Sequence, residues 1–131
     1  MNYEAAGLGL ADKGEGLFHE VSIRLFGSMS VEKEKFNDER AWGVWTLKNG
    51  DKVFMVHTFA GEVVQGGSGQ AKGTKNIIGG TGKYAGIKGS IPTIRHMVKS
   101  AVDGVGISYL KGTMKYTLPS SVREYSKREW I

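Results

Sequence analysis

Hydrophobic and polar side chains alternate along residues 17–26, and this period of two is typical of a β-strand with one apolar face. The odd positions are Leu17, His19, Val21, Ile23 and Leu25. The even positions are more mixed, and they are Phe18, Glu20, Ser22, Arg24 and Phe26. We therefore expect a strand whose second face carries polar and charged side chains.

The clearest hairpin in the sequence lies within residues 40–60. Segments 40–47 and 52–60 are rich in β-branched and aromatic residues, and residues 48–51 between them read Lys-Asn-Gly-Asp. Asparagine followed by glycine is a strong turn signal, because both residues tolerate the backbone angles of a tight hairpin. Alternation within the first strand places Trp42 and Trp45 on opposite faces, so at most one of them lines an interior.

Further strands are expected at residues 29–36, 61–66, 72–78, 84–91 and 107–118. The chain has 20 glycines and 2 prolines, which favours many turns and bends over long helices. About eight short strands without helices between them indicate an antiparallel barrel or sandwich. We favour an all-β fold with a single eight-stranded antiparallel β-barrel.

The length of 131 residues suits one domain with one core. We expect residues 1–15 to form a poorly ordered or edge-hugging arm, residues 16–119 the barrel, and residues 120–131 a tail with a terminal helical turn. Residues 93–103 fit an irregular strand or a short helix, and their pattern does not choose between the two. Residues 66–70 read as a flexible loop tip.

Composition narrows the class of protein. Hydrophobic residues make up 40% of the chain and charged residues 24%, and no apolar run approaches the length of a membrane span. The absence of cysteine excludes a disulfide framework, thiolate catalysis and cysteine-ligated zinc. Residues 1–16 lack the pattern of a signal peptide. The chain as written fits the cytoplasm, and a removed leader would make it periplasmic or secreted.

The net charge of +5 and the isoelectric point near 9.5 raise nucleic acid as a partner. The cationic residues are scattered along the chain, however, and Glu124 and Glu129 interrupt the one basic and aromatic stretch, at the C-terminal end. We therefore expect no nucleic-acid partner. A mild positive excess serves solubility or an anionic ligand equally well.

Residues 79–89 read Gly-Gly-Thr-Gly-Lys-Tyr-Ala-Gly-Ile-Lys-Gly and raise the possibility of a phosphate-binding loop. The spacing does not fit a Walker loop, because Ile77 and Tyr84 occupy positions that require glycine and a hydroxyl residue. It does not fit a dinucleotide-binding loop, because Ala85 stands where the third glycine belongs. The stretch therefore predicts a glycine turn between two strands, with Gly86 and Gly89 allowing the second strand to bend.

Residues 79–84, followed by Gly86 and Gly89, resemble the glycine hairpin of the allene oxide cyclase and dirigent superfamily of eight-stranded β-barrels. Residues 19–24 and 50–54 are similar to segments of small bacterial proteins of unassigned function. This resemblance implies a barrel whose lumen takes a small, mostly apolar molecule, a dimer or trimer, and cofactor-free chemistry where there is any. It transfers no catalytic residue to this chain.

Strand alternation sends one face of each strand into the lumen of a small barrel, so polar residues on that face are the candidates for chemistry. A carboxylate in an apolar cavity can act as a general acid or base, and arginine or tyrosine can stabilise an oxyanion. The expected catalytic residues are Glu20, Arg24, His57 and Tyr109. The expected ligand-binding residues are Ser22, Arg40, Trp42, Met55 and Phe59.

Two other interpretations of these residues stay open. Glu20 and Arg24 can simply pair at the rim while Ser22 faces water, and His57 or His19 can have a structural role. The three histidines lie on separate segments without the close spacing of a metal site, so we expect no metal and no cofactor.

The function predicted from these observations is binding of a small apolar or aromatic molecule with a cofactor-independent isomerase, cyclase or lyase step. The alternative is a non-catalytic carrier or a dirigent-like binding protein. A weaker third possibility is an interaction module that uses the outer faces of the strands and the tail.

Overall fold

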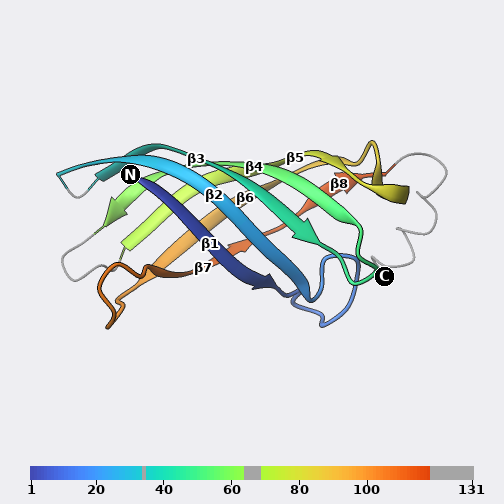
Figure 1. Ribbon diagram of the computed structural model, residues 1–131, viewed down its shortest axis with the longest axis horizontal. Coiled ribbons are helices and arrows are strands. Elements are labelled where there is room, and N and C mark those ends of the chain that lie inside the picture. Colours follow the sequence, from blue (N-terminus) through green and yellow to red (C-terminus); the bar gives the residue numbers. More distant parts are fainter. Residues whose placement is uncertain (34, 64–68, 119–131) are drawn as a thin grey trace.

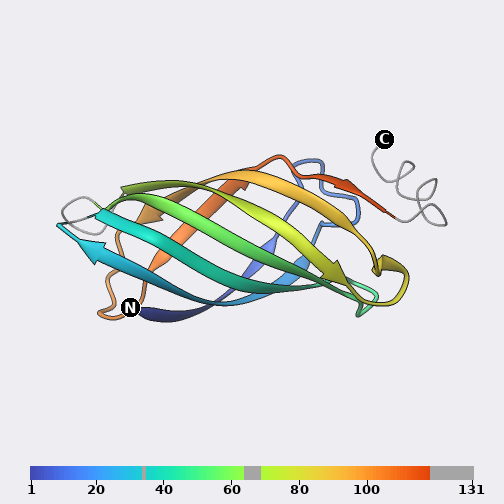
Figure 2. The ribbon, with the colours of Figure 1, turned by 90° about the horizontal axis from the view of Figure 1, so that it is seen from above.

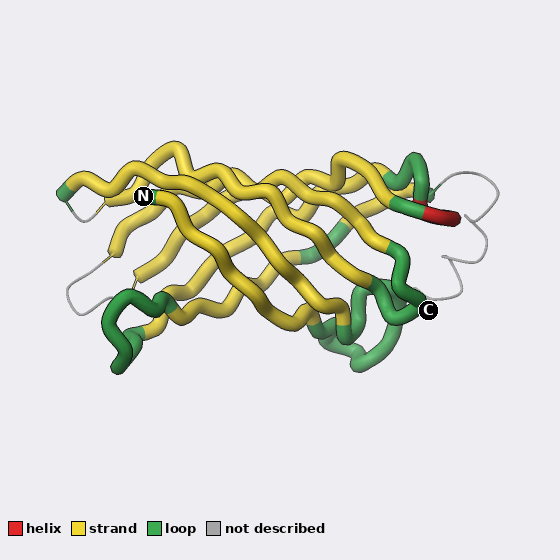
Figure 3. The backbone as a smooth tube through the Cα atoms, viewed as in Figure 1, coloured by secondary structure: helices red, strands yellow, loops and turns green. Residues whose placement is uncertain are grey.

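A computed structural model describes residues 1–33, 35–63 and 69–118. It consists of antiparallel strands and one short 3₁₀ turn, η1 (Figure 3). The elements are β1 (Asn2–Gly9), β2 (Val21–Glu32), β3 (Lys35–Thr46), β4 (Lys52–Val63), β5 (Gly69–Gly80), η1 (Gly82–Tyr84), β6 (Lys88–Val98), β7 (Ile107–Gly112) and β8 (Lys115–Thr117).

The strands form one 8-stranded sheet in the order β1-β2-β3-β4-β5-β6-β7, and β8 also pairs with β6. From β1 to β7 each strand therefore lies beside its neighbour in sequence, whereas β8 lies beside β6. The sheet is strongly curled: in Figure 1 β3, β4 and β5 lie along the top, and Figure 2 places β1 and β2 on one side and β6 and β7 on the other. The sequence-based expectation of an all-β, eight-stranded antiparallel fold is confirmed.

The expected closed barrel is wrong. In the part of the chain that the structure describes, β1 pairs with β2 and β7 pairs with β6, but no ladder joins β1 to β7 or β8. Closure needs a continuous hydrogen-bonded strand on each edge. Here the last edge is divided between β7 and the short β8, and every residue of β7 is exposed. The sheet consequently has an open side between β1 and β7.

Several strand boundaries also differ from the expected ones. The supposed arm at 1–15 contains β1, a full edge strand of the sheet. The strand expected at 29–36 is interrupted after Glu32, where Lys33 lies in a turn with a positive φ of 50°, and β3 begins at Lys35. The strand expected at 107–118 is two strands. The tail expected at 120–131 lies outside the described residues, as do residues 66–68 of the loop tip expected at 66–70, whereas residues 69 and 70 belong to β5.

Other predictions are confirmed. The hairpin of β3 and β4 turns at 48–51, where Gly50 has a φ of 90° and its N–H donates to the carbonyl of Leu47. At residues 93–103, where the sequence left a strand and a helix open, β6 continues as a strand as far as Val98. The glycine stretch at 79–89 does turn between β5 and β6, at residues 81–87. The strand expected at 84–91 begins only at Lys88, so Gly86, with a φ of 86°, lies in the turn and not within a strand.

Alternation gives the curled sheet an inner face and an outer face, and the core fills one end of the inner face. Its buried members are Val21, Trp45, Leu47, Val53, Met55, Ile77, Tyr84, Ile87, Ile91 and Leu118. Phe18, from the segment before β2, packs edge-on against Trp45 and Tyr116 at ring distances of 5.9 and 5.2 Å. This aromatic contact covers the filled end. The other end of the inner face holds a smaller apolar cluster around Phe59 and Ala71, together with polar side chains.

Candidate functional site

The middle and the second end of the inner face carry a cluster of ionisable side chains from five strands. Glu39, His57 and Lys75 are 1%, 3% and 7% exposed, which is unusual for such residues. The cluster, which we call the inner polar cluster, consists of Tyr3 on β1, Glu39 on β3, His57 on β4, Lys75 on β5 and Arg95 on β6.

A β-bulge positions Glu39. The pairing of β3 with β4 shifts by one residue between Phe36 and Glu39, and Asp38 within this bulge has a positive φ of 52°. After the shift Glu39 stands opposite Phe59, and both side chains are buried on the inner face. An inserted residue of this kind re-aims the side chains that follow it.

Glu39 forms an ion pair with Arg95 across the inner face of the sheet. Arg95 Nη2 donates to Glu39 Oε2 over 2.6 Å, although β4 and β5 separate the two strands in the sheet. The curl of the sheet brings these side chains together. The Arg95 guanidinium also lies 4.8 Å from the centre of the Phe59 ring, which favours the charged group in a partly desolvated place.

Tyr3 reaches the same ion pair from β1. Its ring lies against Gly27, where an added Cβ would stand 2.6 Å from the phenol oxygen, so a glycine is required there. Burial raises the pKa of the Tyr3 hydroxyl, and the negative charge of Glu39 raises it further. The phenol is therefore a neutral hydrogen-bond donor at physiological pH.

His57 is a neutral imidazole in this environment. Burial, and then the positive charges of Lys75 and Arg95, lower the pKa of His57 from 6.5 to about 3. Its ring lies across Gly43, where an added Cβ would stand 3.0 Å from Nε2. Within residues 1–33, 35–63 and 69–118, Nε2 is buried and has no hydrogen-bond partner.

Lys75 stands directly opposite His57 in the register of β4 and β5. Its Nζ lies 5.2 Å from the centre of the Trp45 ring, and among the described residues no carboxylate pairs with it. Burial, and then the charge of Arg95, lower the pKa of Lys75 from 10.5 to about 8. The inner polar cluster thus contains one neutralised pair, Glu39 with Arg95, and one cation without a counter-ion.

Three residues named from the sequence lie on the inner face. Met55, His57 and Phe59 are all nearly fully buried there. Trp42 and Trp45 lie on opposite faces, as their spacing predicts, but the inner residue is Trp45 and not the expected Trp42. Of the expected catalytic set, only His57 belongs to the inner polar cluster.

The other expected residues are exposed. The even positions of β2 face outward because the apolar Val21, Ile23 and Leu25 face the core. Arg24 pairs with Glu4 on the outer face, and Glu20 lies before the strand beside His19. Ser22, Arg40 and Trp42 also lie on the outer face, and Tyr109 on the edge strand β7 stacks on His96 at 4.8 Å.

Sequence reasoning missed Tyr3, Glu39, Lys75 and Arg95. A signal for two of them was present: Lys75 is in phase with Ala71 and Ile77, and Arg95 is in phase with Ile91, so alternation puts each charge in an apolar row. The position of Glu39 depends on the bulge and could not be read from alternation alone. Tyr3 lies in a segment that was not expected to be a strand of the fold.

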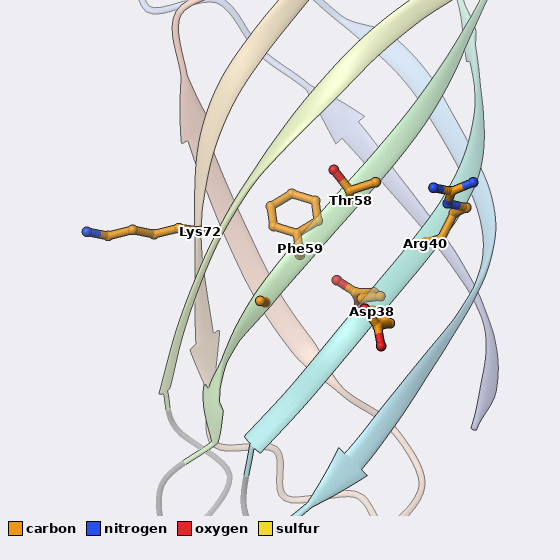
Figure 4. A pocket seen from close by; sticks show the side chains of 7 residues that line it. Asp38, Arg40, Thr58, Phe59 and Lys72 are labelled. Atoms are coloured by element: carbon orange, nitrogen blue, oxygen red, sulfur yellow. The ribbon is translucent and has the colours of Figure 1, made fainter.

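A separate hollow of about 380 Å³ lies on β3, β4 and β5 (Figure 4). Most of its lining residues are on the outer face, and they include the expected ligand-binding residue Arg40. The full lining is Asp38, Glu39, Arg40, Thr58, Phe59, Ala60 and Lys72. Glu39 and Phe59 extend inward from the same strands, so this hollow and the inner polar cluster lie on opposite sides of the sheet.

Among the residues that the structure describes, no group of three or more histidine or acidic side chains is placed to hold a metal ion. In the same part of the chain, no helix is long and apolar enough to cross a membrane. In comparisons with protein-family models, with curated proteins and with solved structures, this chain matches none of them.

Proposed function

We propose that the protein binds a small apolar or aromatic molecule on the inner face of the curled sheet and moves a proton on it without a cofactor. An isomerase, cyclase or lyase step belongs to this class of chemistry. The observation that carries the proposal is the buried Lys75 opposite His57, a cation with no counter-ion among the described residues and with a neutral imidazole beside it. Buried charges are normally paired, and one that is not is a candidate for binding or catalysis.

Unsatisfied buried atoms support a bound molecule at this place. Trp45 Nε1 and His57 Nε2 are both buried and lack a hydrogen-bond partner within the described residues. Such atoms are rare in folded proteins, and a ligand oxygen or a water molecule satisfies them. The positive charge of Lys75 would also stabilise a ligand oxygen that lies near it.

The surroundings favour an apolar or aromatic body for the ligand. Phe59 and Ala71 form a small buried cluster, and Met29 and Met97 pack against it from neighbouring strands. Methionine side chains adapt to irregular shapes and contact aromatic rings favourably. The inner face therefore combines an apolar surface with a few polar groups, which is the usual composition of a small-molecule site.

The chemistry assigned to the cluster follows from its protonation states. A lysine with a pKa of about 8 exists partly as the free amine at neutral pH and can act as a general base. The neutral hydroxyl of Tyr3 and the Arg95 guanidinium are donors for oxygen atoms that gain negative charge.

A non-catalytic carrier is the second candidate function. It is favoured by His57, since an imidazole with a pKa of about 3 is a weak base at neutral pH. A carrier would use the same residues for binding alone.

Kinship with the allene oxide cyclase and dirigent superfamily forms part of the proposal. It is supported by the eight-stranded antiparallel sheet, in which β1 to β7 follow one another in sequence order, and by the glycine turn between β5 and β6. The open side between β1 and β7 is a difference from the closed barrels of that superfamily.

We also propose a homo-oligomer, because large apolar side chains are exposed on both edge strands. These side chains are Leu8, Ile107, Tyr109 and Leu110. Unpaired sheet edges with apolar side chains invite pairing with another chain. Light scattering coupled to size-exclusion chromatography measures the oligomeric state, and a monomer at all concentrations would refute this part.

The proposed function is tested with a panel of small aromatic and apolar compounds. Binding is measured by ligand-observed NMR with the full chain, the Lys75→Met variant and the control variant Lys72→Met on the outer face of the same strand. We expect binding that Lys75→Met weakens and Lys72→Met leaves unchanged. Exchange of a ligand C–H proton with deuterated solvent then separates a catalyst from a carrier. Equal binding by both variants would contradict the proposed site.

A further inference from the structure

We infer that Lys75 forms an imine with an aldehyde or ketone bound on the inner face, so that carbonyl compounds with an apolar or aromatic body are the ligand class. This inference rests on the proposed function, and it adds the chemical class of the ligand and a covalent step. Among the described lysines Lys75 is buried, whereas the others are exposed.

The surroundings of the Lys75 amine differ from those of a lysine held for structure. A structural buried lysine has a carboxylate partner, because an uncompensated charge in the interior is costly. The carboxylate of the cluster, Glu39, already accepts from Arg95 over 2.6 Å. Lys75 Nζ instead lies over the face of the Trp45 ring, 5.2 Å from its centre. This arrangement leaves the nitrogen available to react.

The protonation state suits a nucleophile. Only the uncharged amine attacks a carbonyl carbon, and burial together with the charge of Arg95 favours that form. With a pKa of about 8, roughly half of the Lys75 amine is free at pH 8, against roughly one part in several hundred for a lysine of ordinary pKa.

The covalent step balances without a co-reactant. The Lys75 nitrogen attacks the carbonyl carbon, a C–N bond forms, and the carbonyl electron pair moves to oxygen, which takes a proton from the nitrogen. The resulting carbinolamine then loses its hydroxyl group with the second nitrogen proton as water, and a C=N bond remains. Once protonated, this imine withdraws electrons from the neighbouring C–H bond. Proton transfer at that carbon then needs no cofactor.

The open side of the sheet gives a small molecule access to the inner face. Ser108 and Leu110 of β7 stand opposite Met97 and Arg95 in the register of β6 and β7, yet both are exposed. A residue that faces the interior and still contacts solvent shows that solvent reaches the inner face along this edge. A small carbonyl compound can enter by the same route.

The experiment is reductive trapping with benzaldehyde as the probe. The full chain is incubated with benzaldehyde and sodium cyanoborohydride over a range of pH, and peptide mass mapping locates the benzylated amine. We expect Lys75 to react about tenfold faster than any exposed lysine, with a rate that rises through a midpoint near pH 8. Labelling spread evenly over exposed lysines, or confined to the exposed N-terminal amine of Met1, would overturn the inference.

Two variants sharpen the result. Lys75→Arg keeps the positive charge but removes the nucleophile, and we expect it to lose the specific product. Lys72→Arg changes the outer face of the same strand, and we expect it to keep the product. The mapping of the wild-type chain decides the question even if Lys75→Arg does not fold.

A parallel measurement separates this inference from the proposed function. Benzyl alcohol has the same aromatic body but cannot form an imine, and its binding is followed by ligand-observed NMR. Saturable binding of benzyl alcohol that Lys75→Met weakens, without trapping of benzaldehyde at Lys75, refutes the imine and leaves the proposed binding function standing. Absence of both binding and trapping refutes both.

Discussion

His57 and Lys75 stand directly opposite each other on the inner faces of β4 and β5, and they are 3% and 7% exposed. The charge of Lys75 contributes to lowering the pKa of His57, and burial is the largest cause of the shift for both residues. The buried charge of Lys75 therefore destabilises the folded state electrostatically. Removing that charge by mutation, or compensating it with a bound ligand, should change the stability measurably.

The first prediction is that Lys75→Met stabilises the protein at pH 7, by roughly 1–3 kcal/mol, because it removes a buried charge that has no counter-ion within residues 1–33, 35–63 and 69–118. The pKa of Lys75 is lower in the folded state, at about 8, than in the unfolded state, near 10.5. Between these values the unfolded state binds more protons, so the wild type gains stability as pH rises. The advantage of the variant should disappear above about pH 10.5.

Urea denaturation across this pH range measures the difference between the two proteins. Lys72→Met on the outer face serves as the control, with an expected change near zero. A destabilised Lys75→Met at pH 7 would show that the amine has a partner that stabilises it.

The second prediction concerns acid. The pKa of His57 is lowered to about 3 in the folded state, so between pH 6.5 and 3 the unfolded state takes up a proton that the folded state does not. Stability should fall as pH decreases through this window, by up to about 1.4 kcal/mol per pH unit from this group. His57→Gln should reduce the fall, and His96→Gln on the outer face should retain it. Identical acid profiles for wild type and His57→Gln would contradict the burial of a neutral imidazole.

The third prediction compares two ion pairs. Glu39→Gln leaves Arg95 without its carboxylate beside the charge of Lys75, and we expect a loss of about 3–5 kcal/mol. Glu4→Gln breaks the exposed pair with Arg24, and the expected loss is below about 1 kcal/mol. Denaturant midpoints of both variants give the comparison. Similar losses would mean that the Glu39–Arg95 pair is not buried as described.

The fourth prediction tests the position of the His57 ring against Gly43. An alanine Cβ at position 43 would stand 3.0 Å from His57 Nε2, whereas one at position 7 would meet nothing within 4 Å. Gly43→Ala should therefore displace the imidazole and cost roughly 1–3 kcal/mol, while Gly7→Ala should be close to neutral. The NMR shifts of His57 and the unfolding midpoint report the two effects. Unchanged His57 shifts in Gly43→Ala would place the ring elsewhere.

The sequence predicts the strands well because alternation and turn residues are local signals. The hairpin at 48–51 and the turn at 79–89 follow from asparagine and glycine positions that need particular backbone angles. Closure into a barrel depends instead on whether the first and last edges meet, and that is a property of the whole sheet. The division of the last edge at residues 113–114 has no strong local signal.

The candidate site was harder to predict, because the residues that look catalytic in the sequence lie on the outer face, opposite to the face that apolar alternation buries. The polar row of Glu20, Ser22 and Arg24 attracts attention in the sequence, but apolar burial turns this row outward. The inner polar cluster consists of single charges within otherwise apolar rows, joined only by the curl of the sheet. The pairing of Glu39 with Arg95 spans positions far apart in the sequence, and no spacing motif connects them.

The central claim, a reactive amine that faces a ligand site on the inner face, is tested most directly by NMR titration of the lysine side chains. With ¹³C-labelled lysine, Lys75 should titrate near pH 8 and its signal should shift on addition of a bound aromatic compound, whereas the signal of Lys72 should not respond to the compound. Titration of Lys75 together with the solvent-exposed lysines, and no response to any compound that binds, would contradict the claim.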